Sequence, residues 1–243
     1  REGMFSPVEA ELTPHLRPRN RLEVLVYPVP KRRPEPADRT QASDVVKPAV
    51  GYGWDWHPRL VPLGIWDDTG LQLRHESHLT DVVVSYTLDE DLAGAGLRIA
   101  AEGRACDGCC GSWELLDAEG RCTARAEGPV GQPLETRIER PRLWWTHDHG
   151  TPVLYTSRYR LFDARGNELE RVEEHIGFRR IRLVMNEGAW SEPKGFPKTR
   201  SAAPAQIELN GRRIFAKGTN WVCPELFPGI LNDARYEELT DMA

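Results

Sequence analysis

Long apolar runs and an excess of positive charge are both missing from this sequence of 243 residues. No hydrophobic segment reaches the ~18 residues that a membrane-spanning helix needs. Residues 1–5 (REGMF) also lack the apolar core of a secretory signal peptide. With a formal net charge of −5, the chain offers no basic surface for nucleic acid or an anionic membrane. We therefore expect neither a nucleic-acid partner nor a membrane partner.

Cysteine is scarce as well, and three of the five cysteines are crowded into Cys106-Asp107-Gly108-Cys109-Cys110. An odd, clustered set is a poor disulfide framework. A zinc site would need a second Cys/His pair at ligand spacing, and the His-x-His pair in residues 146–150 lacks a third ligand. We expect turns with reduced thiols, no metal, no other cofactor, and a reducing, cytoplasmic location.

Short alternating apolar segments bounded by Gly, Pro, Asp and Asn dominate the chain and predict a mainly β fold. The expected strands are 22–27, 82–88, 97–101, 113–116, 153–162, 169–176 and 180–184, the second set beginning near residue 71. Turns are expected at 93–96, 117–120 and 163–167. Several short strands with turns between them over residues 71–185 favour an immunoglobulin-like β-sandwich.

The connections divide the chain further. Seven prolines between residues 28 and 62 predict a long surface loop. Residues 186–205, rich in Pro, Lys, Gly and Ser, are interpreted as a linker. After them, Asn210-Gly211 between alternating segments predicts a hairpin with a type I′ turn. Asn232 or Asp233 can cap a final helix, which continues to the last residue without a stop signal.

The densest motif is Trp54-Asp55-Trp56, at the end of the proline-rich loop. One interpretation is a loop stapled into a core by its indoles. The other is a sugar site, since indole faces stack on the apolar C–H face of a pyranose and a carboxylate accepts hydrogen bonds from vicinal hydroxyls.

This motif resembles the Trp-Asp-Trp-Gly-Pro loop of β-mannosidases and related enzymes of glycoside hydrolase family 2. Segments 2–5, 20–26 and 63–66 are similar to the end of the family's sugar-binding jelly roll. Segments 142–145, 154–155 and 177–183 are similar to its immunoglobulin-like domain, and segments 210–221, 227–228 and 235–236 to the entry of its (β/α)8 barrel. His57 stands in place of the usual glycine.

The resemblance implies a domain order. It consists of the C-terminal part of a jelly-roll sugar-binding domain (1–70), an immunoglobulin-like sandwich (71–185), a linker (186–205) and the first βα unit of a (β/α)8 barrel (206–243). The chain is then expected to be a central piece of a longer protein, with the remainder of its own polypeptide as partner and with possible self-association of the piece alone.

The resemblance also implies a function, namely retaining hydrolysis of β-linked mannosides or related glycosides at non-reducing ends. The family's two catalytic glutamates lie on later barrel strands, so this chain is expected to hold no catalytic residue and to be inactive alone. Glu168 and Glu187 follow asparagines but are not expected to be catalytic. The residues expected to bind sugar in the −1 subsite are Trp54, Asp55, Trp56, Asn220, Trp221 and Glu225.

Two alternatives remain open. The first is a non-catalytic carbohydrate-binding β-sandwich module. The second is another activity of the same family, namely exo-β-glucosaminidase, β-galactosidase or β-glucuronidase.

Overall fold

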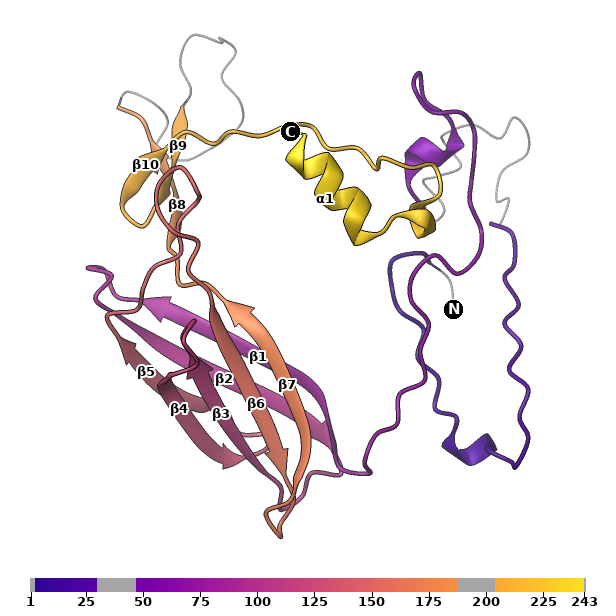
Figure 1. The fold of residues 1–243 in the computed structure, drawn as a ribbon, viewed down its shortest axis with the longest axis horizontal. Helices are drawn as coiled ribbons and strands as arrows, with labels where there is room; N and C mark the ends of the chain where they lie inside the picture. Colours follow the sequence, from indigo (N-terminus) through magenta and orange to yellow (C-terminus); the bar gives the residue numbers. More distant parts are fainter. Residues whose placement is uncertain (1–2, 30–46, 188–203, 243) are drawn as a thin grey trace. The chain divides into compact units, whose positions relative to one another are not determined.

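The computed structural model describes residues 3–29, 47–187 and 204–242 (Figure 1). The chain divides into two compact units. One unit consists of Arg1–Leu71 together with Asn220–Ala243, and the other is Gln72–Thr219. Each unit is described by itself.

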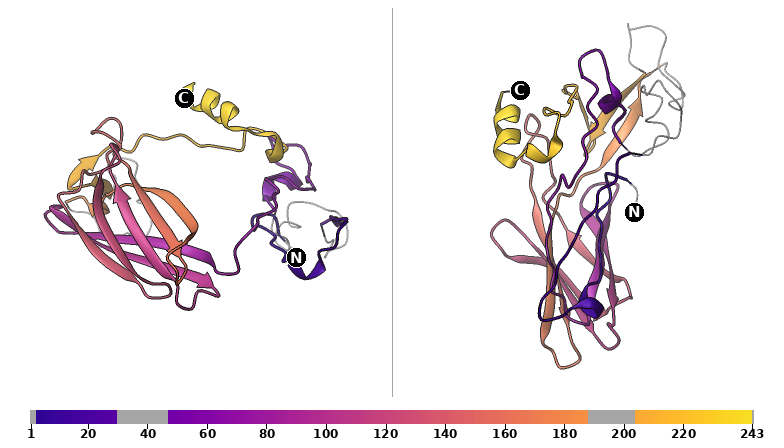
Figure 2. Two further views of the ribbon diagram at one scale, coloured as in Figure 1. Left: turned by 60° about the horizontal axis from the view of Figure 1, so that its bottom comes forward. Right: turned by 90° about the vertical axis from the view of Figure 1, so that its right-hand side faces the viewer.

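The larger unit contains a β-sandwich of two antiparallel sheets (Figures 1 and 2). The three-stranded sheet has the order β1-β2-β5, with β1 His78–Leu88, β2 Gly94–Arg104 and β5 Leu134–Glu139. The four-stranded sheet has the order β4-β3-β6-β7, with β3 Cys110–Leu116, β4 Cys122–Pro129, β6 Tyr155–Phe162 and β7 Glu168–Ile176. The predicted mainly β, sandwich architecture is confirmed.

The sandwich core follows from the two-residue period of its strands. Along β6, Tyr155, Ser157, Tyr159 and Leu161 are all buried, and the residues between them are half-buried. Because successive side chains of a strand point to opposite faces, this alternation directs one set into the space between the sheets. Trp113 on the neighbouring strand β3 is fully buried, and its indole Nε1 donates a 2.8 Å hydrogen bond to Ser157 Oγ.

A second, smaller sheet lies in the same unit. It has the order β10-β9-β8, with β8 Ile181–Met185, β9 Ala205–Leu209 and β10 Arg212–Ile214. Asn210 and Gly211 join β9 to β10 with φ values of 50° and 80°. Both central residues of a type I′ turn need positive φ, so the predicted hairpin is confirmed. The predicted linker lies mostly in 188–203, outside the described residues, and the domain boundaries stay predictions.

The Asn210 side chain ties this hairpin to two other segments. Its Oδ1 accepts a 2.8 Å hydrogen bond from the Arg180 amide, and its Nδ2 donates one of 2.9 Å to the Trp144 carbonyl. Asn210 is only 7% exposed, so these groups cannot turn to water when the partner is lost. The hairpin is therefore anchored by side-chain bonds as well as by its ladder.

We expect Asn210→Ala to lower the free energy of unfolding by about 2–3 kcal/mol, because it removes two buried hydrogen bonds and places a poorly suited residue at positive φ. Asn210→Gly keeps the backbone conformation and should cost less. Thermal melts of both variants, with hydrogen exchange of the β9 and β10 amides, measure the effect. Equal stability of Asn210→Ala and wild type would show that the side chain does not anchor the hairpin.

The smaller unit has short helices and irregular segments in its described part. The 3-10 helices are η1 Thr13–His15, η3 Ala49–Tyr52 and η4 Pro228–Ile230, and the α-helix is α1 Asp233–Asp241. Asn232 caps α1, because its Oδ1 accepts a 2.9 Å hydrogen bond from the amide of Arg235. The predicted capped helix is confirmed.

Several local predictions are wrong. Residues 22–27 are not a strand, and the side chains of Leu22, Val24 and Leu25 are exposed. An alternating segment becomes a strand only when a neighbour pairs with its amides and carbonyls, and no described segment does so here. The second set of strands begins at 78 rather than near 71.

The turn expected at 93–96 is also wrong, because β2 already begins at Gly94 and the turn precedes it. The amide of Leu92 donates to the Asp89 carbonyl at 3.0 Å, and the amide of Asp89 donates to the Gly94 carbonyl at 2.9 Å. Small residues therefore mark the start of the strand here, and the turn is formed by the preceding polar residues.

Strands β4 and β5 were not predicted, since CTARAEGP and LETRIE contain few large apolar side chains.

Candidate functional site

The Trp54-Asp55-Trp56 motif forms the tip of a tight turn in the smaller unit. The Trp54 amide donates to the His57 carbonyl at 2.9 Å, and the His57 amide donates back to Trp54 at 3.3 Å. Below the tip, the Leu60 amide donates to the Gly51 carbonyl at 2.9 Å. Gly53 enters the turn with φ of 111°, a conformation that favours glycine. The motif is therefore held by backbone bonds on both sides of its tip.

Tyr52 anchors the base of this turn. Its side chain is 4% exposed, and the guanidinium carbon of Arg59 lies 5.6 Å from the ring centroid. Burial raises the pKa of the Tyr52 hydroxyl, and the charge of Arg59 acts in the opposite direction. The buried Tyr52 ring supplies the packing that holds the turn in place. The side chains at the tip can therefore remain exposed to solvent.

At the tip, the three motif side chains are exposed. Trp54 is 49% exposed and Trp56 is 54% exposed. Asp55, which lies between them in the sequence, is also exposed. Within the described residues, the Asp55 carboxylate has neither an ion pair nor a hydrogen bond. The interpretation of this motif as a loop stapled into a core by its indoles is therefore wrong for Trp54 and Trp56.

A small cavity of about 90 Å³ lies beside the turn and is closed by the C-terminal segment of the same unit. Trp56 and His57 line it from the turn, and Glu225 and Leu226 line it from the C-terminal segment. The ring of Trp56 meets that of His57 edge-to-face at 5.7 Å. The fold therefore brings two of the predicted sugar-binding residues, Trp56 and Glu225, to one cavity from distant parts of the sequence.

Lys47 is a cavity residue that sequence reasoning missed. Its Nζ donates a 2.7 Å hydrogen bond to the Pro62 carbonyl, and burial lowers the pKa of its ammonium group. Met4, which also lines the cavity, accepts a 3.0 Å hydrogen bond at its carbonyl from the indole of Trp66. Neither residue belongs to a motif, so only the folded chain reveals them.

The remaining predicted residues lie outside the cavity lining. Trp221 is 49% exposed and stacks on Tyr236 of α1, with ring centroids 6.5 Å apart and an interplanar angle of 27°. Asn220 is exposed. Glu225 itself is half-buried, and its carbonyl accepts a 3.3 Å hydrogen bond from the Cys223 thiol.

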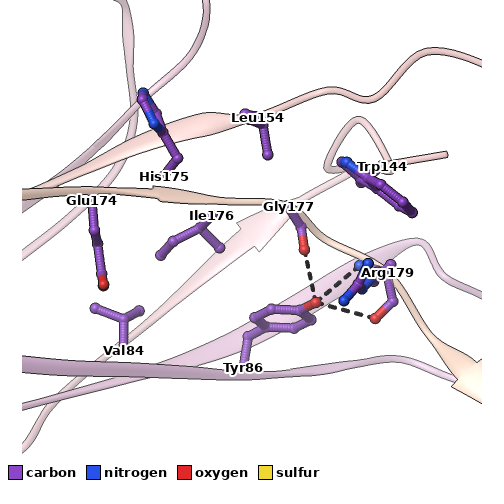
Figure 3. Close-up of a pocket in the computed structure, with 9 residues that line it drawn as sticks. All are labelled: Val84, Tyr86, Trp144, Leu154, Glu174, His175, Ile176, Gly177 and Arg179. Atoms are coloured by element: carbon purple, nitrogen blue, oxygen red, sulfur yellow. Dashed lines mark hydrogen bonds between the residues drawn. The ribbon is translucent and has the colours of Figure 1, made fainter. Parts of the chain in front are cut away.

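A second cavity, of about 400 Å³, lies in the sandwich unit and contains none of the predicted site residues (Figure 3). The Tyr86 hydroxyl donates to the Gly177 carbonyl at 2.8 Å and accepts from the Arg179 amide at 3.0 Å. The guanidinium carbon of Arg179 lies 4.7 Å from the Trp144 ring centroid. Arg179 therefore covers one face of this indole, and that face is not available to a ligand.

In the described ranges, no group of three or more His, Cys, Asp or Glu side chains could hold a metal ion. The only α-helix of those ranges, α1, has nine residues, and no helix found there is long and apolar enough to cross a membrane.

Comparison with protein families matches two parts of the chain. Residues 77–179 match the model described as "Glycosyl hydrolases family 2". Residues 1–67 match "Glycosyl hydrolase 2 galactose-binding domain-like". The two matches fall in the order that the sequence motifs predicted, and the chain belongs to glycoside hydrolase family 2.

Its relatives include β-mannosidases. The chain is 27% identical over 195 residues to β-mannosidase B of Thermothelomyces thermophilus, covering 79% of this chain and 22% of that protein. It is 28% identical over 193 residues to β-mannosidase B of Aspergillus niger, covering 76% and 21%. The chain thus spans about a fifth of the length of these curated relatives.

The fold is similar to a solved β-D-mannosidase from Dictyoglomus thermophilum, with a TM-score of 0.66 and 22% identity over 81% of this chain and 24% of that one. A β-glucuronidase from Parabacteroides merdae gives a TM-score of 0.52 with 18% identity, covering 69% of this chain and 20% of that one. These likenesses support the fold of the family and leave the choice of sugar open.

Proposed function

We propose that this chain is part of a β-mannosidase-like retaining β-glycosidase, in which the Trp54-Asp55-Trp56 turn binds the sugar at the non-reducing end. The observation that carries the proposal is the exposed carboxylate of Asp55, which has no partner in the described ranges and lies between two half-exposed indoles. Indole faces suit the C–H face of a pyranose, and a free carboxylate accepts hydrogen bonds from two neighbouring hydroxyls.

The other predicted residues would extend this −1 subsite. Glu225 shares a cavity wall with Trp56, so its carboxylate is positioned to contact the same sugar. Asn220 and Trp221, which lie in an irregular segment after β10 rather than on the expected first barrel strand, would contribute from this C-terminal segment. In this proposal His57, at the base of the tip, contributes through its edge contact with Trp56.

Catalysis itself would come from two glutamates outside this chain, about 5–5.5 Å apart, one as acid/base and one as nucleophile. The candidates within the chain do not fit that role. Glu168 begins β7 and is paired with Arg171 at 2.8 Å. Glu187 follows β8 and is exposed.

The test compares the 243-residue chain with the same chain extended along its reading frame in both directions. The extended protein is expected to hydrolyse an aryl β-mannoside faster than the corresponding galactoside, glucuronide or glucosaminide. NMR should show that the sugar is first released as the β anomer. The 243-residue chain is expected to release no aryl group above a buffer blank.

The outcomes separate the proposal from its alternatives. Turnover by the 243-residue chain would contradict the assignment of catalysis to residues outside it. Preference of the extended protein for another glycoside would assign another activity of the family. Tight calorimetric binding of mannose by the 243-residue chain, together with an inactive extended protein, would favour the non-catalytic binding module.

A further inference from the structure

The turn between β2 and β3 carries the cysteine cluster, for which the proposed glycosidase function has no use. All five cysteines of the chain are free thiols. The Cys109 amide donates a 2.9 Å hydrogen bond to the Cys106 carbonyl, and Gly108 has φ of 77°. These are the features of a four-residue turn, whose first and last Cα atoms lie less than ~7 Å apart. Disulfides span Cα distances of ~4.4–6.8 Å, so the backbone suits a bridge from Cys106 to Cys109.

The Cys106 thiol donates to the backbone carbonyls of His78 at 3.6 Å and Arg104 at 3.3 Å, beside the core that Cys109 enters. Cys109 is 6% exposed and belongs to the sandwich core, and the partly buried Cys106 packs against the same core. Burial raises the pKa of the Cys106 thiol, and the neighbouring Cys109 thiol raises it further through charge and a side-chain hydrogen bond. A Cβ placed on Gly103 would lie 2.5 Å from Cys106 Sγ, so the sulfur occupies space that glycine leaves open.

The third cysteine of the cluster faces elsewhere. Cys110 is the first residue of β3 and is exposed, and its thiol donates to the Gly128 carbonyl on β4 at 3.4 Å. Successive side chains of a strand point to opposite faces, which directs Cys109 inward and Cys110 outward. A bridge between these adjacent cysteines would require the buried one to leave the core.

We propose that Cys106 and Cys109 are a thiol-oxidation site that forms a reversible disulfide with low-molecular-weight disulfides such as oxidised glutathione. The more accessible Cys106 thiolate attacks one glutathione sulfur, forming a mixed disulfide and releasing one glutathione thiolate. The Cys109 thiolate then attacks Cys106 Sγ and expels the second. The two thiols lose two protons and two electrons, and the glutathione disulfide gains the electrons as two thiols.

The surroundings set the pH dependence of this step. The side chains that act on Cys106 electrostatically are Cys109, Glu170 from β7 and Tyr159 from β6. None of the three supplies positive charge, so the thiolate is scarce at neutral pH. Because the thiolate is the nucleophile, oxidation should be slow at pH 7 and faster at pH 8.5.

The test oxidises the folded 243-residue chain with excess oxidised glutathione at pH 8.5, alkylates the remaining thiols after an acid quench, and maps the tryptic peptides. Trypsin cuts after Arg104 and Arg121, so one peptide carries all three clustered cysteines. We expect this peptide to lose two hydrogen atoms through the Cys106–Cys109 bridge and to carry one added group, alkyl or glutathionyl, on the exposed Cys110. The same bridge should require roughly tenfold more oxidant in urea, where the turn no longer holds the thiols together.

Matched variants give distinct products. Cys110→Ser should still form the bridge. Cys109→Ser should stop at a glutathione adduct on Cys106, and Cys109→Ala repeats this if the serine variant is unstable by circular dichroism. Alkylation of Cys106 or Cys109 in place of Cys110, or equal oxidation in urea and in the native state, would overturn the proposal.

Discussion

Replacing Trp113 by alanine is expected to lower the free energy of unfolding of the sandwich by about 4 kcal/mol, as large aromatic-to-alanine changes in cores do. Trp113 is 0% exposed and lies on β3, between β4 and β6 in the four-stranded sheet. Its removal leaves a large void between the sheets and also leaves the buried Ser157 hydroxyl without the indole donor. For a domain of this size, the melting midpoint should fall by on the order of 15 °C.

The change is measured by urea unfolding, followed by circular dichroism. Trp113→Phe keeps most of the packing and loses the hydrogen bond, so its cost should be intermediate. Trp54→Ala is the matched control, since it removes a tryptophan that is 49% exposed and should change stability by less than about 0.5 kcal/mol. If both alanine variants unfold at the same urea concentration, Trp113 is not the centre of the core that the structure describes.

The strands that the sequence predicted are those whose core face is marked by large apolar residues. In β6, YTSRYRLF alternates clearly, and it pairs along its whole length with β7. In β5, LETRIE has only Leu134 and Ile138 to mark the buried face, and this is too little for prediction. The turn residue Asn210 acts through its own backbone conformation and the cap residue Asn232 through a side-chain bond to an amide three residues away, so both could be predicted from local sequence.

The local sequence pattern did not predict which segments pair with one another over long distances in the chain. Residues 22–27 alternate as a strand does but have no pairing partner in the described structure.

The candidate site also has one part that the local sequence predicted and one part that depends on long-range packing. The turn at 54–57 is closed by bonds between near neighbours, so its motif could be recognised from sequence. The meeting of Lys47 and Glu225 at one cavity depends on how distant segments pack, and no spacing rule predicts it.

Asp55→Ala in the extended protein is expected to lower kcat/KM for an aryl β-mannoside roughly a hundredfold. Hydrogen bonds to a charged group contribute about 1.5–3 kcal/mol each, and about 1.4 kcal/mol corresponds to a tenfold change in rate. Two hydroxyl contacts of modest strength therefore account for the expected loss. Asp55→Asn keeps one acceptor oxygen and should lose less.

Stability separates a binding role from a structural one. Because the Asp55 carboxylate is exposed and makes no ion pair or hydrogen bond in the described ranges, its removal should leave the melting midpoint of the 243-residue chain unchanged. Asp68→Ala removes another exposed carboxylate of the same unit and should change neither stability nor kcat/KM. If Asp55→Ala lowers the melting midpoint and leaves kcat/KM intact, this aspartate supports its own turn. If Asp55→Ala lowers kcat/KM and leaves the melting midpoint unchanged, the carboxylate contacts the sugar.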